Sequence, residues 1–148
     1  TRTLRVGSGG VMLPHYSPLK VAETFNMLGA LFPDRVDLAV GRAAGTDPLT
    51  AYALQRDRRG AGPDDFPDQL GELLGYLRDG LPQASRFTRL LRPQPWSPPV
   101  WMLGSSPQSA VWAAEQGLPY AFADFINPNG RSAAAHYRQT FTPSRLQP

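Results

Sequence analysis

The sequence predicts an α/β fold of parallel strands covered by helices. Four short apolar runs recur along the chain, and each precedes a segment with helix start signals and apolar residues three or four positions apart. Such alternation favours parallel strands joined by right-handed crossovers. The composition agrees with this class, because 41% of the 148 residues are hydrophobic, which is enough for a buried core.

The first unit starts with an apolar run at residues 4–13, which predicts a strand. Ser17 and Pro18 follow as a helix N-cap and a first-turn proline. We expect this helix to bury one face, because apolar side chains recur along it at helical spacing. The predicted face carries Leu19, Ala22, Phe25, Leu28 and Phe32.

The second unit has a predicted strand at residues 36–40 and a helix start at Asp47 and Pro48. The polar segment 56–65 predicts a loop. A further helix is expected from about residue 67, because four leucines follow at helical spacing. These are Leu70, Leu73, Leu74 and Leu77.

The third unit is preceded by residues 83–99, a proline-rich segment that predicts an extended connection. The strand is expected at residues 100–103, and Ser106 with Pro107 repeats the helix start signal. Gly117 is placed to end this helix as a C-cap.

The fourth unit consists of a predicted strand at residues 120–125 and a helical segment at 131–141. Asp124 and Asn127 come at the end of this strand, where they could face a site. The sequence assigns neither of them a role.

Composition excludes several classes of function. The chain has no cysteine, so thiolate catalysis, disulfides and cysteine metal sites are excluded, and its two histidines match no metal spacing. The net charge of +3 is spread along the chain without the basic cluster of a nucleic-acid-binding protein. No apolar run approaches a membrane span, and no signal-peptide pattern is present. We therefore expect a cytoplasmic protein.

Glycines interrupt the first apolar run, in the stretch VGSGGVMLPH at residues 6–15. No Gly-Lys-Ser/Thr follows, and Gly9 and Gly10 do not open a helix, so neither a Walker loop nor a dinucleotide fingerprint is present. Glycine within a strand marks a bulge or a close approach by a ligand or another backbone. The residues favour the bulge and leave the ligand open.

Two turns after predicted strands suit an anion, and ligands bind at the carboxyl ends of parallel strands. Arg42 follows the second strand, and its planar guanidinium fits a phosphate, although an ion pair with Asp37 or Asp47 is an alternative. Ser105 and Ser106 open the third helix, where free N–H groups and the helix dipole attract anions. A plain N-cap role for Ser106 is the alternative. Together the two turns predict one phosphate site.

Residues 5–48 and the segment PPVWMLGSSPQSA at 98–110 resemble the bacterial-luciferase-like flavin monooxygenases, in particular luciferase-like oxidoreductases of unknown substrate. The resemblance extends over residues 5–141. It implies a (β/α)8 TIM barrel that binds reduced FMN and activates O2 as a flavin hydroperoxide. A separate flavin reductase would supply the reduced FMN, and the substrate would be a small molecule.

The resemblance also implies site residues. A non-prolyl cis peptide beneath the flavin ring falls on Gly9 and Gly10. The phosphate would be bound by Arg42 and by the helix start at Ser105 and Ser106, with Ser109 one turn further on. No catalytic acid or base and no metal site is assigned. His15 and Tyr16 are weaker rim candidates, and a solvated His15 is the expectation; Trp96, Trp101 and Trp112 could line a pocket.

The chain supplies about four βα units, which match the third to sixth units of such a barrel and form one partial domain over residues 1–148. A half barrel leaves strand edges unpaired, so a stable monomer is not expected. We expect that the chain is a fragment of a longer protein. The alternatives are that only this part of the protein was kept, or that two copies complete each other. A homodimer is expected in preference to a monomer. Rival functions are deazaflavin-dependent hydride transfer and flavin binding without catalysis.

Overall fold

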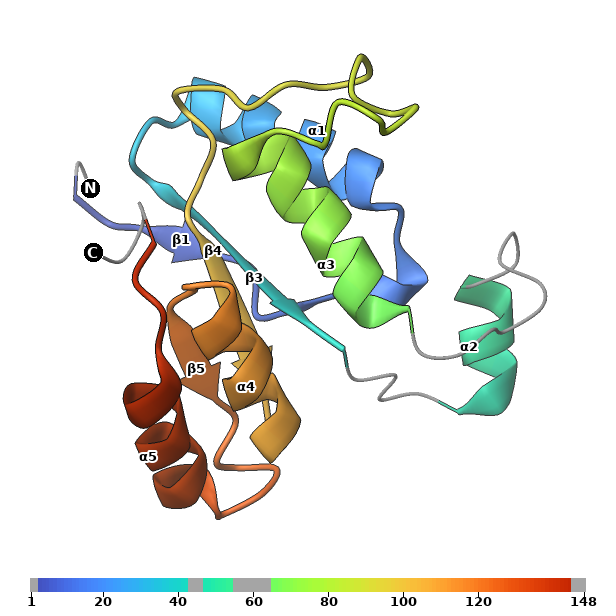
Figure 1. Cartoon of the computed structure of the whole chain (residues 1–148). Helices are drawn as coiled ribbons and strands as arrows, with labels where there is room; N and C mark the ends of the chain where they lie inside the picture. The colour runs from blue at the N-terminus through green and yellow to red at the C-terminus, as the bar shows by residue number, and fades with distance from the viewer. Residues whose placement is uncertain (1–2, 43–46, 55–64, 145–148) are drawn as a thin grey trace. The chain divides into compact units, whose positions relative to one another are not determined.

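The computed structural model describes residues 3–42, 47–54 and 65–144 (Figure 1). The polar segment 56–65 therefore lies almost wholly outside the described residues. Helices follow strands along the chain in the predicted alternation. Among the described residues, no helix is both long and apolar enough to cross a membrane.

The strands form one sheet in the order β1-β3-β4-β5, and β2 also pairs with β3. Both β3 with β4 and β4 with β5 are parallel, as predicted. Three of the four predicted strands are present with bounds close to those expected, although the last is shorter. The strands are β1 (Val6–Gly7), β2 (Val11–Met12), β3 (Val36–Gly41), β4 (Val100–Gly104) and β5 (Tyr120–Phe122).

The predicted strand at residues 4–13 is wrong as a continuous element. β1 ends at Gly7, β2 begins at Val11, and a short 3₁₀ turn, η1 (Leu13–His15), follows. The chain turns between the two strands at Gly10, whose φ is 122°. Glycine adopts this angle without strain, whereas other residues rarely do. The run predicted as one strand is therefore two short strands separated by the glycines.

The chain forms two compact units. Unit 1 comprises Thr1–Val6, Met12–Val36 and Arg42–Pro98, and unit 2 comprises Gly7–Val11, Asp37–Gly41 and Pro99–Pro148. Unit 1 contains α1 (Pro18–Leu31), α2 (Pro48–Leu54), α3 (Phe66–Leu74) and the π-helical turn η2 (Gly75–Asp79). Unit 2 contains most of the sheet together with α4 (Pro107–Glu115) and α5 (Gly130–Thr140).

In unit 1, α1 packs against α3. The four leucines predicted at helical spacing after residue 67 lie in α3 and η2 and are all buried, together with Phe66 and Tyr76. The buried residues of α1 include Ala22, Asn26 and Gly29. Of the predicted face only Ala22 is fully buried; Leu19, Phe25 and Leu28 are half-buried. Phe32, which caps the helix, is 56% exposed, so its predicted burial is wrong.

Gly29 and Asn26 explain why α1 buries this face. A Cβ at Gly29 would collide with the carbonyl oxygen of Trp96. Asn26 Oδ1 accepts a hydrogen bond of 2.6 Å from Ser97 Oγ. The connection 83–99, which contains neither helix nor strand as predicted, therefore packs directly on α1.

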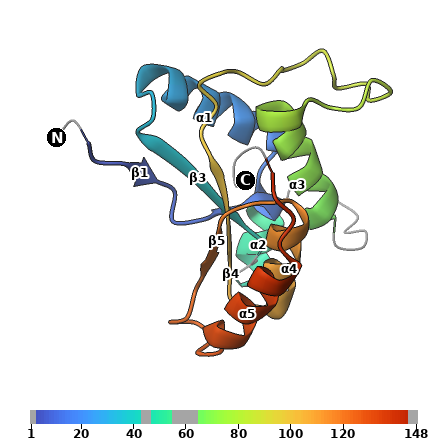
Figure 2. The same ribbon diagram turned by 60° about the vertical axis from the view of Figure 1, so that its left-hand side comes forward.

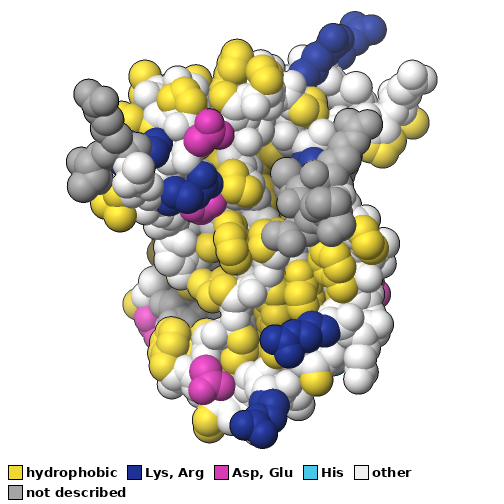
Figure 3. Space-filling model, turned by 90° about the vertical axis from the view of Figure 1, so that its left-hand side faces the viewer, with side chains coloured by type: hydrophobic (Ala, Val, Ile, Leu, Met, Phe, Trp, Pro, Cys, Tyr) yellow, Lys and Arg dark blue, Asp and Glu magenta, His cyan; other side chains and the backbone are white. Residues whose placement is uncertain are grey.

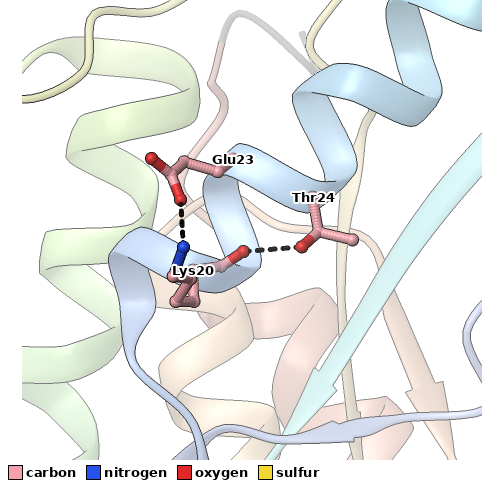
Figure 4. Close-up of polar contacts among 3 residues, drawn as sticks. All are labelled: Lys20, Glu23 and Thr24. Carbon is pink, nitrogen blue, oxygen red and sulfur yellow. Dashed lines mark hydrogen bonds and ion pairs between the residues drawn. The ribbon is translucent and has the colours of Figure 1, made fainter.

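The solvent side of α1 carries polar contacts (Figure 4). Lys20 Nζ lies 3.0 Å from Glu23 Oε2, and both side chains are exposed. Thr24 Oγ1 donates to the carbonyl oxygen of Lys20 at 2.8 Å. Exposed pairs of this kind stabilise a helix only slightly.

In unit 2, α4 and α5 lie side by side and contact β4 and β5 (Figures 1 and 2). The parallel register places Leu38 opposite Val100 and Val40 opposite Met102, and these four side chains are buried. The alternate positions, such as Ala39 opposite Trp101, are only half-buried. The sheet thus has a closed face and a more open face.

Many apolar side chains are exposed in the described part of the chain, and Figure 3 shows hydrophobic side chains gathered at the surface of the face that it views. Large exposed apolar areas are typical of interaction surfaces. The most exposed of these residues are Phe125, Leu49, Leu31, Ile126 and Val6.

Candidate site at the carboxyl ends of the strands

The carboxyl ends of β3, β4 and β5 lie at one edge of the sheet, because these strands are parallel neighbours. The strands end at Gly41, Gly104 and Phe122, respectively. Ligands in parallel α/β folds bind at this edge. The turns that follow β4 and β5 therefore form the candidate site of unit 2.

Arg42 directly follows the last residue of β3 and is exposed, and residues 43–46 lie outside the described part of the chain. The carboxylate of Asp47 caps α2: Oδ1 accepts hydrogen bonds from the backbone N–H groups of Leu49 and Thr50 at 3.0 and 3.1 Å. Thr50 Oγ1 donates to Asp47 Oδ2 at 2.6 Å, and these bonds lower the pKa of Asp47. The cap that the sequence favoured for Asp47 is confirmed.

Gly9 and Gly10 join β1 to β2. No peptide bond among the described residues is cis, so the cis bond expected at Gly9-Gly10 is wrong. The positive φ of Gly10 makes the turn with a trans bond, and a Cβ there would lie 2.8 Å from Leu103 Cδ2. A Cβ at Gly9 would meet nothing within 4 Å. The backbone conformation at position 10 thus requires glycine, whereas a Cβ at position 9 would lie in open space.

Ser8 lies in the gap between β1 and β2, and sequence reasoning did not single it out. Its hydroxyl accepts a hydrogen bond from the N–H of Ala39 and donates one to the carbonyl of Ala39, both at 2.9 Å. The side chain therefore takes the place of a backbone partner for β3. A serine next to paired glycines was the available signal.

The helix start after β4 is open to a ligand. Ser106 is the N-cap of α4 with an extended backbone, but its side chain makes no cap hydrogen bond to the described residues. The N–H groups of Ser106 and Gln108 donate no hydrogen bond within the described part of the chain. Unpaired N–H groups at the positive end of a helix attract anions. The Ser106 hydroxyl is likewise not engaged in capping.

Ser109 is placed differently from Ser105 and Ser106, because it is 4% exposed. Its Oγ donates to the carbonyl of Ser106 at 2.6 Å and lies 3.0 Å from Tyr120 Oη. Since the Ser109 proton is used on Ser106, Tyr120 is the donor in the second bond. Burial raises the pKa of Tyr120. Ser109 thus connects the first turn of α4 to β5.

The loop after β5 also contacts the helix start. Asn127 Nδ2 donates to the carbonyl of Ser105 at 2.8 Å. Asp124 Oδ1 accepts a hydrogen bond of 3.1 Å from the N–H of Gly130, the first residue of α5. Both residues stand at the strand end that the sequence indicated. Asp124 supports α5, and Asn127 supports the turn at Ser105.

The remaining candidate residues lie outside the turns that follow β4 and β5. His15 is 7% exposed, so the expected solvated histidine is wrong, because η1 folds it into unit 1. Tyr16 is 50% exposed. Trp101 Nε1 donates to Asp37 Oδ1 at 3.3 Å, which gives Asp37 a partner other than Arg42. No group of metal-binding side chains occurs in the described residues.

Comparisons with known proteins agree with this architecture. The family model for luciferase-like monooxygenases matches residues 1–144. The chain is 47% identical over 149 residues to the uncharacterized protein YwcH of Bacillus subtilis, covering 99% of this chain and 44% of that protein. It is 46% identical over 150 residues to a luciferase-like monooxygenase of Escherichia coli K12, covering 97% of this chain and 42% of that protein.

Among solved structures, the crystal structure of apo-MsnO8 matches with a TM-score of 0.81 and 45% identity, covering 97% of this chain and 42% of that one. The chain therefore spans less than half the length of the relatives that it matches. The predicted α/β barrel class is confirmed, here as a part of the barrel. From its sequence match and its structure, the chain belongs to the luciferase-like monooxygenase family.

Proposed function

We propose that this chain forms the flavin phosphate site of an FMN-dependent monooxygenase that uses reduced FMN and O2. The observation that carries the proposal is the open start of α4 at the carboxyl edge of the sheet, within a chain of the luciferase-like monooxygenase family. Bound reduced FMN would supply the electrons for oxygen activation, and the protein would supply binding and orientation.

The phosphate would be held by three kinds of group. The N–H groups of Ser106 and Gln108 have no hydrogen bond within the described chain and lie at the positive end of α4. The hydroxyls of Ser105 and Ser106 could donate two further bonds. Arg42 would add a permanent positive charge and a bidentate donor. Ser109 would support the site without touching the phosphate, because its hydroxyl donates to the carbonyl of Ser106.

The flavin ring would lie against the turn at Gly9 and Gly10. Gly9 is exposed, and the space where its Cβ would stand is empty to 4 Å. Absence of a side chain lets a flat ring approach the backbone closely. Ser8 keeps this turn fixed to β3 through its two hydrogen bonds to Ala39.

The remaining parts of the proposal rest on the resemblance to the family. A flavin reductase would deliver the reduced FMN, the substrate would be a small molecule, and a homodimer would cover part of the exposed apolar surface. The protein would act in the cytoplasm. Specificity groups in the rest of such a barrel fall outside a chain that spans 42–44% of its relatives.

A binding titration tests the proposal. The chain is titrated with reduced FMN under anaerobic conditions, beside Arg42→Ala and the control Arg138→Ala, which removes an exposed arginine from the last turn of α5. We expect saturable binding that weakens about 30-fold in Arg42→Ala, because a charge-assisted hydrogen bond contributes roughly 2 kcal/mol. The control should bind like the unmodified chain.

Two results would contradict the proposal. Equal binding by both arginine variants would remove Arg42 from the site. A deazaflavin, extracted from the protein as purified, would replace FMN by the cofactor of a hydride-transfer enzyme. Oxygen consumption with NADH and a flavin reductase then separates a monooxygenase from a flavin-binding protein without catalysis.

A further inference from the structure

We infer that Asn127 is a positioning residue of the phosphate site, which fixes the peptide between Ser105 and Ser106 so that the N–H groups of α4 stay available to an anion. This inference rests on the proposed function. Its basis is the hydrogen bond of 2.8 Å from Asn127 Nδ2 to the carbonyl of Ser105. The bond joins the loop after β5 to the turn after β4, 22 residues apart in the sequence.

The geometry of the peptide bond turns this contact into a directional constraint. In a planar trans peptide the C=O and N–H groups point in opposite directions. Asn127 holds the carbonyl of Ser105, so the N–H of Ser106 must point to the other side of the peptide. That N–H donates no hydrogen bond within the described chain. Asn127 thus keeps the partially negative carbonyl oxygen of Ser105 on the side of the peptide opposite the partially positive N–H of Ser106.

The loop holds Asn127 in one orientation. Asn127 Oδ1 accepts a hydrogen bond of 2.6 Å from Asn129 Nδ2, while Nδ2 donates to Ser105. A flipped amide would place oxygen against the carbonyl oxygen of Ser105 and lose both bonds. The backbone N–H of Asn127 donates to the carbonyl of Ala123 at 3.3 Å, which anchors the loop to the end of β5.

The chemistry of the amide suits this role better than a charged group would. Asparagine donates to a carbonyl without bringing a negative charge toward a bound phosphate. Aspartate at this position would lose the donor and oppose both the Ser105 carbonyl and the phosphate. The side chain is half-buried, so solvent only partly replaces the bond to Ser105 when the amide is removed.

The test compares reduced FMN with reduced riboflavin, which lacks the phosphate, under anaerobic conditions. The variants are Asn127→Ala, the near-isosteric Asn127→Asp, and the control Thr140→Ala, which removes an exposed side chain from the last turn of α5 and leaves both bonds of the Asn127 side chain in place. We expect Asn127→Ala to lower FMN affinity about tenfold without changing riboflavin affinity. Asn127→Asp should lower FMN affinity further, and Thr140→Ala should change it less than about twofold.

Each other outcome overturns a defined part of the account. An unmodified chain that binds both flavins equally, or neither, contradicts the proposed function and this inference with it. A preference for FMN that Asn127→Ala and Asn127→Asp both retain contradicts only the role of Asn127. Equal loss of both flavins would assign Asn127 a general structural role. A thermal melt of each variant establishes that it is folded, and Asn127→Asp decides the outcome if Asn127→Ala does not fold.

Discussion

Two helices of this protein begin with the same dipeptide, but only one of them starts at a candidate site. Ser17-Pro18 opens α1 and Ser106-Pro107 opens α4, and both serines are extended N-caps without a side-chain cap bond to described residues. Three residues on, α1 has the exposed Lys20, whereas α4 has the buried Ser109. The same local signal therefore has different uses, and the surrounding contacts decide which.

The contacts that hold the start of α4 come from β5 and from the loop after it. Ser109 reaches Tyr120 of β5, and Ser105 is held by Asn127 from the loop after β5. Only two residues separate the end of β4 from the start of α4, whereas α1 follows the 3₁₀ turn η1. A helix start becomes a site for an anion where strands of a parallel sheet end beside it.

The largest expected effect that tests this difference is that of Gly104→Ala. A Cβ at Gly104 would collide with the side chain of Ser109, which is fixed by two hydrogen bonds. We expect the free energy of unfolding to fall by about 2–3 kcal/mol, as for other overpacked positions. Denaturant unfolding measures this change.

Gly71→Ala is the matched control, because a Cβ at Gly71 of α3 would meet nothing within 4 Å. This substitution should stabilise the protein by about 0.5–1 kcal/mol through helix propensity. If Gly104→Ala were as well tolerated as Gly71→Ala, the tight packing at the start of α4 would be disproved.

A smaller effect is expected from Ser109→Ala. The variant loses the bonds to the Ser106 carbonyl and to Tyr120, and Tyr120 Oη is left without this partner. We expect a loss of about 1–2 kcal/mol in the free energy of unfolding, together with weaker FMN binding. Lys20→Ala, at the equivalent position of α1, should cost less than about 0.5 kcal/mol because its ion pair is exposed. Similar losses in both variants would contradict the comparison.

The last expected effect appears only at high pH. Burial raises the pKa of Tyr120 from its ordinary value of 10.0, and burial with the nearby Glu72 raises the pKa of Tyr76 to about 12. The folded state therefore holds these protons more tightly than the unfolded state. The contribution of these two tyrosines to stability is therefore fully present below about pH 10 and is lost as the pH rises through their folded-state pKa values.

Tyr120→Phe tests this dependence in unit 2, and Tyr76→Phe tests it in unit 1. Each should flatten the decline in the denaturation midpoint above pH 10, and only Tyr120→Phe should also disturb α4 through Ser109. An unchanged pH profile in Tyr76→Phe would contradict its raised pKa.

Local signals predicted much of the fold. The starts of α1, α2 and α4 lie at the predicted Ser-Pro and Asp-Pro pairs, because proline and a short polar residue act within one turn. Strands β3 and β4 lie where apolar runs predicted them. The φ of Gly117 is 58°, as its predicted place at the end of a helix requires.

Long-range contacts account for what the sequence missed. Ser8, which lies where the first predicted strand is interrupted, bonds to Ala39, 31 residues away. Ser109 is turned inward by Tyr120, and Asn127 acquires a role only when the loop after β5 meets Ser105. A spacing rule within one segment cannot anticipate such partners. The phosphate-binding roles assigned to Arg42, Ser105 and Ser106 remain predictions.

The most direct test of the central claim follows backbone amide resonances during titration with reduced FMN. The account predicts shifts at the N–H groups of Ser106 and Gln108, no shifts at Leu19 and Lys20 in the first turn of α1, and none at Ser106 or Gln108 with reduced riboflavin. FMN binding that leaves the amides of α4 unmoved would contradict the claim that this helix start binds the phosphate.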